Sequence, residues 1–317
     1  MRDQFSVFSG SAHPDLAREI CALRGMKLSP SVTKHFTNDN LYVQLEQTVR
    51  EKDVFIVQPF YPPPVSDRVL ELLMMLDAAR LASAKRVTAV IPYYSYSRSD
   101  KKDEPRISIA GRLIADLLQT AGAQRVLTMT LHSPQVHGFF GVPTDHLSSM
   151  PVFVNYFRHQ DLSDTTVVTP DIGHAKRGAE LARQLKLPIA AVSKKRVDDA
   201  TVVVDGVIGD IRGHRVILVD DEIDTGGSIV QAVNLVKENG ARRIYVAFVH
   251  PVFSANAAER LAALPVTEFI TTDSIPISGE KRARFGNRLT ILSVAPLLGE
   301  VIRRAHEGRS VGEMFNE

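Results

Sequence analysis

Short runs rich in Val, Ile and Leu alternate with longer segments of helical periodicity along nearly the whole chain. Runs that are apolar at almost every position, with helices between them, indicate parallel strands covered by helices on both faces of a sheet. We therefore expect an α/β fold with mostly parallel sheets flanked by helices. The predicted strands are 6–10, 53–59, 86–92, 125–131, 165–171, 188–194, 201–208, 215–221, 243–250 and 267–273. The predicted helices are 67–83, 107–122, 175–186 and 227–240.

The chain is long enough for two domains, because its 317 residues compare with roughly 100 to 200 residues in a typical domain. Two similar segments, AGAQRVLTMTLH (121–132) and NGARRIYVAFVH (239–250), each place a Gly after a helix, then a strand, then a His. Such internal similarity suggests two related halves. We predict domains at 1–148 and 149–293, followed by a C-terminal helix and tail at 294–317.

Charge and composition narrow the partners and the compartment. The net charge of +2 provides no polycation for nucleic acid, and no stretch approaches the roughly 18 apolar residues that span a bilayer. The N-terminus lacks an apolar run of signal-peptide length. Cys21 is the only cysteine, so no internal disulfide forms and a reducing compartment fits. We expect a cytoplasmic protein without nucleic-acid or membrane partners.

The segment VILVDDEIDTGGSI (216–229) reads as a strand, a tight turn and the start of a helix. In parallel α/β sheets, ligands gather where such turns leave the carboxyl ends of strands. Gly226 and Gly227 let the backbone bend sharply and approach a ligand, and the first N–H groups of the helix favour an anion. Thr225 and Ser228 add hydroxyl donors. The turn is therefore predicted to bind a phosphate.

Acidic residues accompany this turn, namely Asp220, Asp221, Glu222 and Asp224. A sugar phosphate would explain both features, because its phosphate needs donors while its hydroxyls need acceptors. Asp220 and Asp221 would face the hydroxyls directly or through Mg²⁺, a cation that prefers oxygen ligands. The structural alternative is a helix capped by Asp224 or Thr225, but a cap needs only one such residue.

The pattern of a hydrophobic strand, two acids, two variable positions and Asp-Thr-Gly resembles the phosphoribosyl-diphosphate-binding loop of type I phosphoribosyltransferase-fold proteins. Within that fold, nearly the whole chain is similar to ribose-phosphate diphosphokinases. Six further blocks follow the order of that family: FSGSAHPDLA (8–17), KHFTNDN (34–40), RVTAVIPYYSYSRSDKKDEPRISI (86–109), TLHSPQVHGFF (130–140), PDIGHAKR (170–177) and SKKR (193–196). The resemblance implies two tandem phosphoribosyltransferase-like domains.

The resemblance also implies an activity and its participants. The family transfers the pyrophosphoryl group of ATP to the 1-hydroxyl of ribose 5-phosphate, which gives 5-phosphoribosyl 1-diphosphate and AMP. The implied cofactor is Mg²⁺, and the implied assembly is a homo-oligomer built from dimers, up to a hexamer.

The site residues follow from the same resemblance. ATP is expected to contact Phe36, Asn38, Asn40, Arg98, Ser99, Asp100 and His132. Ribose 5-phosphate is expected to contact Asp220, Asp221, Asp224, Thr225, Gly226, Gly227 and Ser228. The expected metal ligands are His132 and Asp171, and the expected catalytic residues are Lys194 and Arg196. These residue types suit the chemistry, since an aromatic ring stacks on a purine and phosphoryl transfer needs cations where charge develops.

Four positions depart from the family pattern. Thr130 stands where the family has Asp beside the metal site, His174 where it has Gly, Ser99 where it has Gln, and Asn40 where it often has an acid. These departures leave open a catalytically silent regulatory relative, which would be an interaction protein and not an enzyme. A phosphoribosyltransferase that consumes the diphosphate is the second alternative, because it would share the 220–228 loop.

Overall fold

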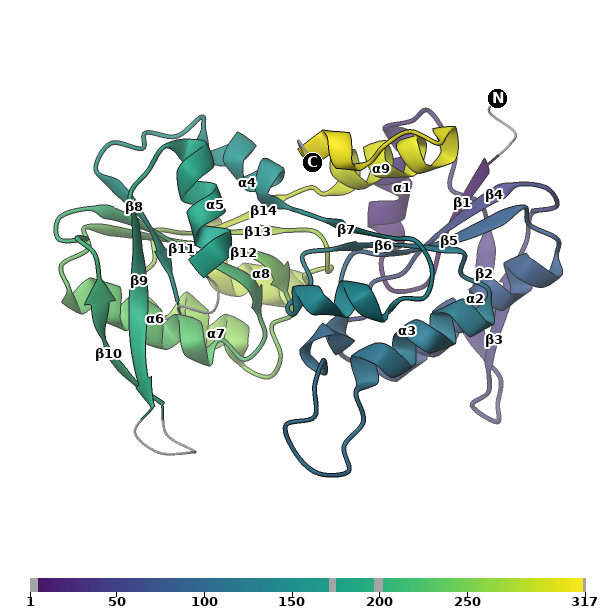
Figure 1. The fold of residues 1–317 in the computed structure, drawn as a ribbon, viewed down its shortest axis with the longest axis horizontal. Helices are drawn as coiled ribbons and strands as arrows, with labels where there is room; N and C mark the ends of the chain where they lie inside the picture. The colour runs from purple at the N-terminus through teal and green to yellow at the C-terminus, as the bar shows by residue number, and fades with distance from the viewer. Residues whose placement is uncertain (1–4, 171–174, 197–201, 316–317) are drawn as a thin grey trace. The chain divides into compact units, whose positions relative to one another are not determined.

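The computed structural model describes residues 5–170, 175–196 and 202–315. The chain divides into two compact units (Figure 1). Unit 1 comprises the chain up to Ser148, Ser274–Pro276 and the C-terminal segment from Val294, and unit 2 comprises Ser149–Asp273 and Ile277–Ser293. Each unit contains a mostly parallel sheet flanked by helices, which confirms the predicted α/β class.

Five parallel strands form the sheet of unit 1, in the order β1-β4-β5-β6-β7. They are β1 (Phe5–Ser9), β4 (Asp53–Val57), β5 (Arg86–Ile91), β6 (Arg125–Met129) and β7 (Thr144–Leu147). Helices cover both faces of this sheet (Figure 1). They are α2 (Val65–Leu81) and α3 (Ala110–Ala121) on one face, and α1 (Pro14–Ala22) and α9 (Ala295–Glu307) on the other.

A hydrophobic core of unit 1 lies between this sheet and helices α2 and α3. All five residues of β4 are buried, as expected for a parallel strand covered on both faces. Helix α2 contributes Leu72, Met75, Leu76 and Ala79 to the same core. Their spacing of i, i+3, i+4 and i+7 places them on one face of the helix.

A two-stranded antiparallel hairpin accompanies the main sheet of unit 1. Its strands are β2 (Ser31–His35) and β3 (Leu41–Leu45), and Thr33 pairs with Val43. Val43 and Leu45 pack against the core of unit 1. The tip of the hairpin, residues 36–40, is exposed.

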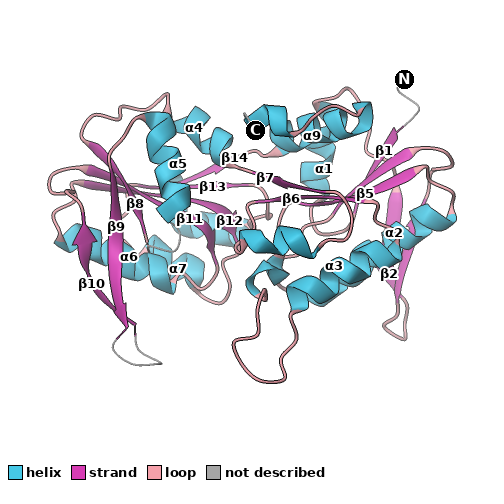
Figure 2. Cartoon of the chain, viewed as in Figure 1, coloured by secondary structure: helices cyan, strands magenta, loops and turns pink. Residues whose placement is uncertain are grey.

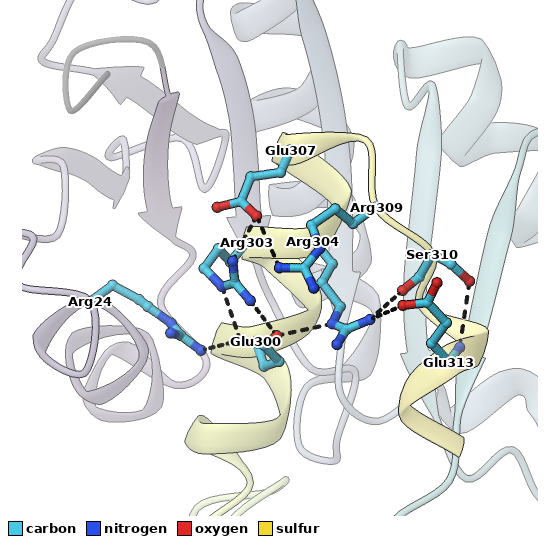
Figure 3. A network of polar contacts seen from close by, with 8 residues as sticks. All are labelled: Arg24, Glu300, Arg303, Arg304, Glu307, Arg309, Ser310 and Glu313. Atoms are coloured by element: carbon cyan, nitrogen blue, oxygen red, sulfur yellow. Dashed lines mark hydrogen bonds and ion pairs between the residues drawn. The ribbon is translucent and has the colours of Figure 1, made fainter. Parts of the chain in front are cut away.

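Charged side chains attach helix α9 to the body of unit 1 (Figure 3). Arg24, two residues after the end of α1, donates to Glu300 of α9 over 2.9 Å. His306 of α9 lies 3.0 Å from Asp53 of β4. Hydrogen bonding from Arg303 lowers the pKa of Glu300 to about 2. The C-terminal segment therefore belongs to the first unit, although it follows the second in sequence.

Seven strands form the sheet of unit 2, in the order β10-β9-β8-β11-β12-β13-β14 (Figure 2). They are β8 (Thr165–Thr169), β9 (Ile189–Arg196), β10 (Val202–Ile208), β11 (Arg215–Ile223), β12 (Arg243–Pro251), β13 (Glu268–Thr272) and β14 (Leu289–Leu292). Within the described part of this sheet, β10 runs antiparallel to β9, and the other neighbouring strands are parallel. The helices are α4 (Met150–Phe157), α5 (Ala175–Leu185), α6 (Gly227–Glu238), α7 (Ala257–Ala262) and α8 (Gly279–Phe285).

The two units share an order of five strands, but the strands that correspond in the two sheets are not the ones that lie in the two similar sequence segments. In sheet order, β1-β4-β5-β6-β7 of unit 1 correspond to β8-β11-β12-β13-β14 of unit 2. Strand β6 thus corresponds to β13, whereas the segments 121–132 and 239–250 match β6 with β12. Their likeness reflects a common turn, because Gly122 and Gly240 both end a helix with a positive φ.

Four described strands lie outside the predicted ones: β2, β3, β7 and β14. Each has only four or five residues, and most of these residues are partly exposed. They form the separate hairpin and one edge of each sheet. A strand that is short and half-buried lacks the long apolar run by which the others were predicted.

A membrane-spanning helix would need a long apolar segment. Within residues 5–170, 175–196 and 202–315, no helix has the length and hydrophobicity to cross a bilayer.

We expect Leu298→Ala in α9 to lower the free energy of unfolding by about 2–5 kcal/mol, because truncating a fully buried leucine leaves a cavity. The matched control is Leu81→Ala at the end of α2, where the side chain is 70% exposed; its effect should stay within about 0.5 kcal/mol. Urea denaturation measures both. Equal midpoints for the two variants would contradict the packing of α9 on unit 1.

Candidate functional site

The order of strands in unit 2 identifies the edge where a ligand can bind. From the central strand β8 the chain crosses to β9 on one side, and it later returns to β11 on the other side. Such a reversal separates the connections that leave the two neighbouring strands and opens a crevice at their carboxyl ends. The turn that links β11 to α6, residues 224–226, lies at this switch point.

The turn has the backbone geometry that the sequence suggests. Gly226 is the residue before α6 and has φ 77° and ψ 4°, a left-handed conformation that a residue with a Cβ adopts only with strain. Helix α6 then begins at Gly227. The first N–H groups of this helix have no acceptor within it and carry the positive end of its dipole.

Neighbouring segments hold the carbonyl side of the turn. The backbone N–H groups of Phe253 and Ser254 donate to the carbonyls of Ile223 and Asp224, over 2.9 and 3.1 Å. Arg260 of α7 donates to the carbonyl of Thr225 over 3.2 Å. These bonds occupy the carbonyl groups of residues 223–225 and leave the amide side of the turn to face a ligand.

The acidic residues before the turn differ in burial. Asp220, Asp221 and Glu222 are 8%, 1% and 7% exposed, respectively, whereas Asp224 is only partly buried. The backbone N–H of Asp221 donates to Oδ1 of Asp220 over 2.9 Å. Arg177 of α5 lies 3.3 Å from Oδ1 of Asp221. Buried carboxylates need such partners to offset the loss of hydration.

The structure therefore brings seven predicted residues together on one loop. Asp220 and Asp221 lie toward the carboxyl end of the buried strand β11, and the five residues from Asp224 to Ser228 form the turn and the start of the helix. Thr225 and Ser228 are exposed, so their hydroxyl groups can reach a ligand. The arrangement offers donors for a phosphate beside acceptors for hydroxyls or ligands for a cation.

Arg177 lies beside the candidate site but is not among the residues predicted from the sequence. It belongs to the PDIGHAKR block (170–177), and helix α5 carries it to Asp221 of β11. A basic residue one turn into the helix after β8 is the signal that could have identified it.

The hairpin of unit 1 carries the first group of predicted nucleotide contacts. The Phe36 ring is 48% exposed and lies 5.3 Å from the Tyr42 ring, and the Nζ of Lys34 lies 5.6 Å from its centre. At the tip, the backbone N–H of Asn40 donates to Oδ1 of Asn38 over 3.2 Å. Phe36 thus keeps an accessible face beside a lysine.

The second group of predicted nucleotide contacts follows β5. Arg98 ends a short 3₁₀ helix, η1 (Ser95–Arg98), and is exposed. The hydroxyl of Ser99 accepts from the backbone N–H of Ala110 over 3.1 Å at the start of α3. Asp100 accepts from Gln135. Ser99 and Asp100 therefore organise the loop, and the exposed Arg98 lies beside them.

His132 follows β6 and is held through its backbone. Its N–H donates to the hydroxyl of Ser97 over 3.3 Å, and the N–H of Leu131 donates to Nε2 of His146 over 2.9 Å. Thr130 precedes them with φ 45° and is 6% exposed. Thr130, which stands where the family has Asp, is thus buried and has a strained backbone conformation.

The remaining predicted residues are only partly described. Asp171, predicted as a metal ligand, and His174 lie outside the described residues. The backbone of Lys194 and Arg196 belongs to β9, where it pairs with Val204 and Val202 of β10. Their side chains lie outside the described part of the chain.

Comparisons with known proteins agree with this geometry. Residues 5–122 match the N-terminal domain of ribose phosphate pyrophosphokinase, and residues 183–316 match the phosphoribosyl synthetase-associated domain. The two matched regions together leave out residues 123–182 and a few residues at the two chain ends.

Similar proteins cover the chain from end to end. A ribose-phosphate pyrophosphokinase of Deinococcus radiodurans is 51% identical over 99% of this chain and 98% of its own length. One from Oceanobacillus iheyensis is 43% identical over 98% of this chain and 96% of its own length.

A solved structure is similar as well. The phosphoribosylpyrophosphate synthetase from Mycobacterium smegmatis superposes with a TM-score of 0.89 and 38% identity, and the match covers 96% of this chain and all of that one. The chain therefore belongs to the ribose-phosphate pyrophosphokinase (diphosphokinase) family.

Proposed function

We propose that this protein transfers the pyrophosphoryl group of ATP to the 1-hydroxyl of ribose 5-phosphate, which yields 5-phosphoribosyl 1-diphosphate and AMP. The observation that carries the proposal is the loop of residues 220–228, where an amide-rich turn and buried carboxylates occur side by side. The full-length similarity to pyrophosphokinases supports it. A phosphoribosyltransferase is less suitable, because it would not need a first unit that matches the kinase family model.

Ribose 5-phosphate binds the loop of unit 2 in this proposal. Its phosphate accepts hydrogen bonds from the amides and hydroxyls between Asp224 and Ser228, which the left-handed turn at Gly226 exposes. Its ring hydroxyls face Asp220 and Asp221. This placement presents the 1-hydroxyl for attack on the β-phosphorus of ATP.

ATP binds residues of unit 1. Phe36 stacks on the purine through its exposed face, with Asn38 and Asn40 of the same tip beside the base. Arg98 pairs with the phosphates. Ser99 contributes weakly, because its hydroxyl already accepts from the start of α3, and Asp100 fixes the loop through Gln135.

Magnesium is the proposed cofactor, and the donor set fits it. Carboxylate oxygens are the ligands that Mg²⁺ prefers, and the chain places buried carboxylates at Asp220 and Asp221. By resemblance to the family, His132 and Asp171 are the proposed ligands on the nucleotide side. When bound, the ion neutralises charge on the phosphates of ATP.

Lys194 and Arg196 are the proposed catalytic residues. The attack is in line with the departing AMP, so negative charge spreads over the transferred phosphoryl oxygens and the leaving oxygen. A lysine supplies a point charge and an arginine a planar pair of donors for these oxygens. Both residues belong to β9, a strand held in the sheet through its ladder with β8.

The assembly and the compartment are also proposals. A homo-oligomer built from dimers, up to a hexamer, is proposed from the family resemblance, and sedimentation of the pure chain would test it. A cytoplasmic location accords with a single, buried cysteine.

The activity is tested by incubating the pure protein with ATP, Mg²⁺ and ribose 5-phosphate. We expect AMP and 5-phosphoribosyl 1-diphosphate in equal amounts, and no product after chelation of the metal. Release of ADP in place of AMP would refute pyrophosphoryl transfer. Absence of any product across phosphate and metal concentrations would favour the catalytically silent alternative.

Lys194→Ala should lower kcat by at least about 100-fold and change the KM values for both substrates far less. Its charge is expected to act mainly in the transition state, so its loss affects the rate more than ground-state binding. Lys237→Ala, at an exposed position in the last turn of α6, is the matched control and should keep full activity. Unchanged kcat in Lys194→Ala would show that the catalytic assignment is wrong.

Asp220→Asn should raise the KM for ribose 5-phosphate and the Mg²⁺ concentration needed for half-maximal rate, each by about tenfold or more. The amide oxygen can still accept from the N–H of Asp221, so the turn is kept while one charge is lost. Asp210→Asn, at an exposed position of the same unit, serves as the comparison. Equal kinetics in both variants would remove Asp220 from the proposed site.

A further inference from the structure

A buried carboxylate at Glu71 gathers hydrogen bonds from three separate segments of unit 1. Glu71 belongs to α2 and is 2% exposed. Its Oε1 accepts from the backbone N–H of Ser11 over 2.8 Å and from the hydroxyl of Thr33 over 2.6 Å. Its Oε2 accepts from the hydroxyl of Ser11 and from Nε2 of Gln58, each over 2.6 Å. Four donors suit a carboxylate, which offers only acceptors.

The three segments follow strands of the same unit or form the hairpin. Ser11 follows β1, Gln58 follows β4, and Thr33 lies within β2. Gln58 is itself fixed, because its Oε1 accepts from the backbone N–H of Ala12 over 3.1 Å. A Cβ on Gly10 would come within 2.3 Å of the same oxygen, so the glycine allows this close packing. Gln58 is therefore oriented by its own contacts so that its Nε2 faces the carboxylate of Glu71.

The hairpin needs such an anchor because its backbone is not part of the main sheet. In unit 2, the hairpin strand β9 is hydrogen-bonded along β8. In unit 1, β2 pairs only with β3 among the described strands. A hairpin of two strands is marginally stable by itself, so side chains must fix its position.

Apart from the apolar packing of Val43 and Leu45 of β3 on the core, the other side-chain contacts that anchor β2 lie on either side of Thr33. The hydroxyl of Ser31 donates to the carbonyl of Ser9 over 3.1 Å at the beginning of β2. His35 lies 4.0 Å from Asp67 of α2, but both side chains are nearly half exposed, and such pairs contribute little. Among the described residues, the bond from Thr33 to the buried Glu71 is thus the link from β2 to the body of unit 1 that lies nearest to the tip and is largely shielded from solvent.

We infer that Glu71 is a positioning residue for nucleotide binding, which acts by holding strand β2 through Thr33. The inference rests on the proposed role of Phe36 and Asn38 in contacting ATP. Displacement of β2 moves the tip that carries both residues, whereas the loop of residues 220–228 belongs to unit 2. Loss of the link therefore weakens ATP binding and spares ribose 5-phosphate.

Thr33→Val removes the hydroxyl that donates to Glu71 and keeps the shape and strand preference of the residue. We expect the KM for ATP to rise about tenfold or more, because a hydrogen bond to a charged group contributes more than a bond between neutral groups. The kcat and the KM for ribose 5-phosphate should change little. Thr33→Ser keeps the hydroxyl and should restore the KM for ATP. Hydrogen exchange of the backbone amides of residues 31–45 should be faster in Thr33→Val than in the unmodified protein, and unchanged in Thr33→Ser.

Thr88→Val is the matched control. Thr88 is fully buried in β5, and its hydroxyl has no hydrogen-bond partner among the described residues. The same substitution there should leave both KM values unchanged, because no hydrogen bond is lost.

Glu71→Gln tests the carboxylate itself. With its amide nitrogen at the position of Oε2, the new side chain would place a donor against Nε2 of Gln58, which is also a donor. A flip of the Gln58 amide would remove this conflict but would lose the hydrogen bond from the N–H of Ala12. We expect a rise in the KM for ATP at least as large as that of Thr33→Val, again without an equal rise for ribose 5-phosphate.

An unchanged KM for ATP in both Thr33→Val and Glu71→Gln would overturn the inference. Equal rises for the two substrates, or a rise that Thr33→Ser does not reverse, would also overturn it, since they indicate a general loss of structure. Failure of the proposed function is recognised separately, because the unmodified protein would then form no AMP.

Discussion

The positive φ of Gly226 is the backbone constraint on which the proposed phosphate site depends. It turns the chain from β11 directly into α6, at the point where the order of strands in unit 2 reverses. The carbonyls before the turn are fixed by Phe253, Ser254 and Arg260. The amides after it begin a helix and have no acceptor within that helix. Asp220 and Asp221 are buried in β11, a few residues before the turn, and their carboxylates provide acceptors beside the amide donors of the turn.

The corresponding connection in unit 1 explains why only one unit has this loop. By sheet order β4 corresponds to β11, and the chain leaves β4 through three consecutive prolines, residues 62–64, before α2 begins at Val65. Prolines have no N–H group, so the three residues before α2 offer no donors, whereas Thr225 and Gly226 before α6 each carry one. Each unit also has a hairpin after its first crossover helix, and both carry predicted substrate contacts: Phe36 in one, and Lys194 and Arg196 in the other. Shared connectivity has thus been adapted to two different tasks.

The sequence predicted the class of the fold and the shape of the 220–228 loop, because both depend on local pattern: buried strands are apolar, and a left-handed turn requires glycine. It failed where the determinant is non-local. The hairpin strands are short and half-buried, and the partners of Asp221 and Glu71 come from distant segments. The similar segments at 121–132 and 239–250 were matched out of register, because a glycine that ends a helix before a strand recurs throughout α/β proteins. The roles assigned to Lys194, Arg196 and Asp171 stay predictions.

The most direct test is a crystal structure of the protein with ribose 5-phosphate bound. The proposed site predicts that the phosphate oxygens lie about 3 Å from the amide nitrogens of Gly226 to Ser228, with the ring hydroxyls toward Asp220 and Asp221. A sugar phosphate bound elsewhere, with the turn at Gly226 empty, would contradict the proposed site and the reaction built on it.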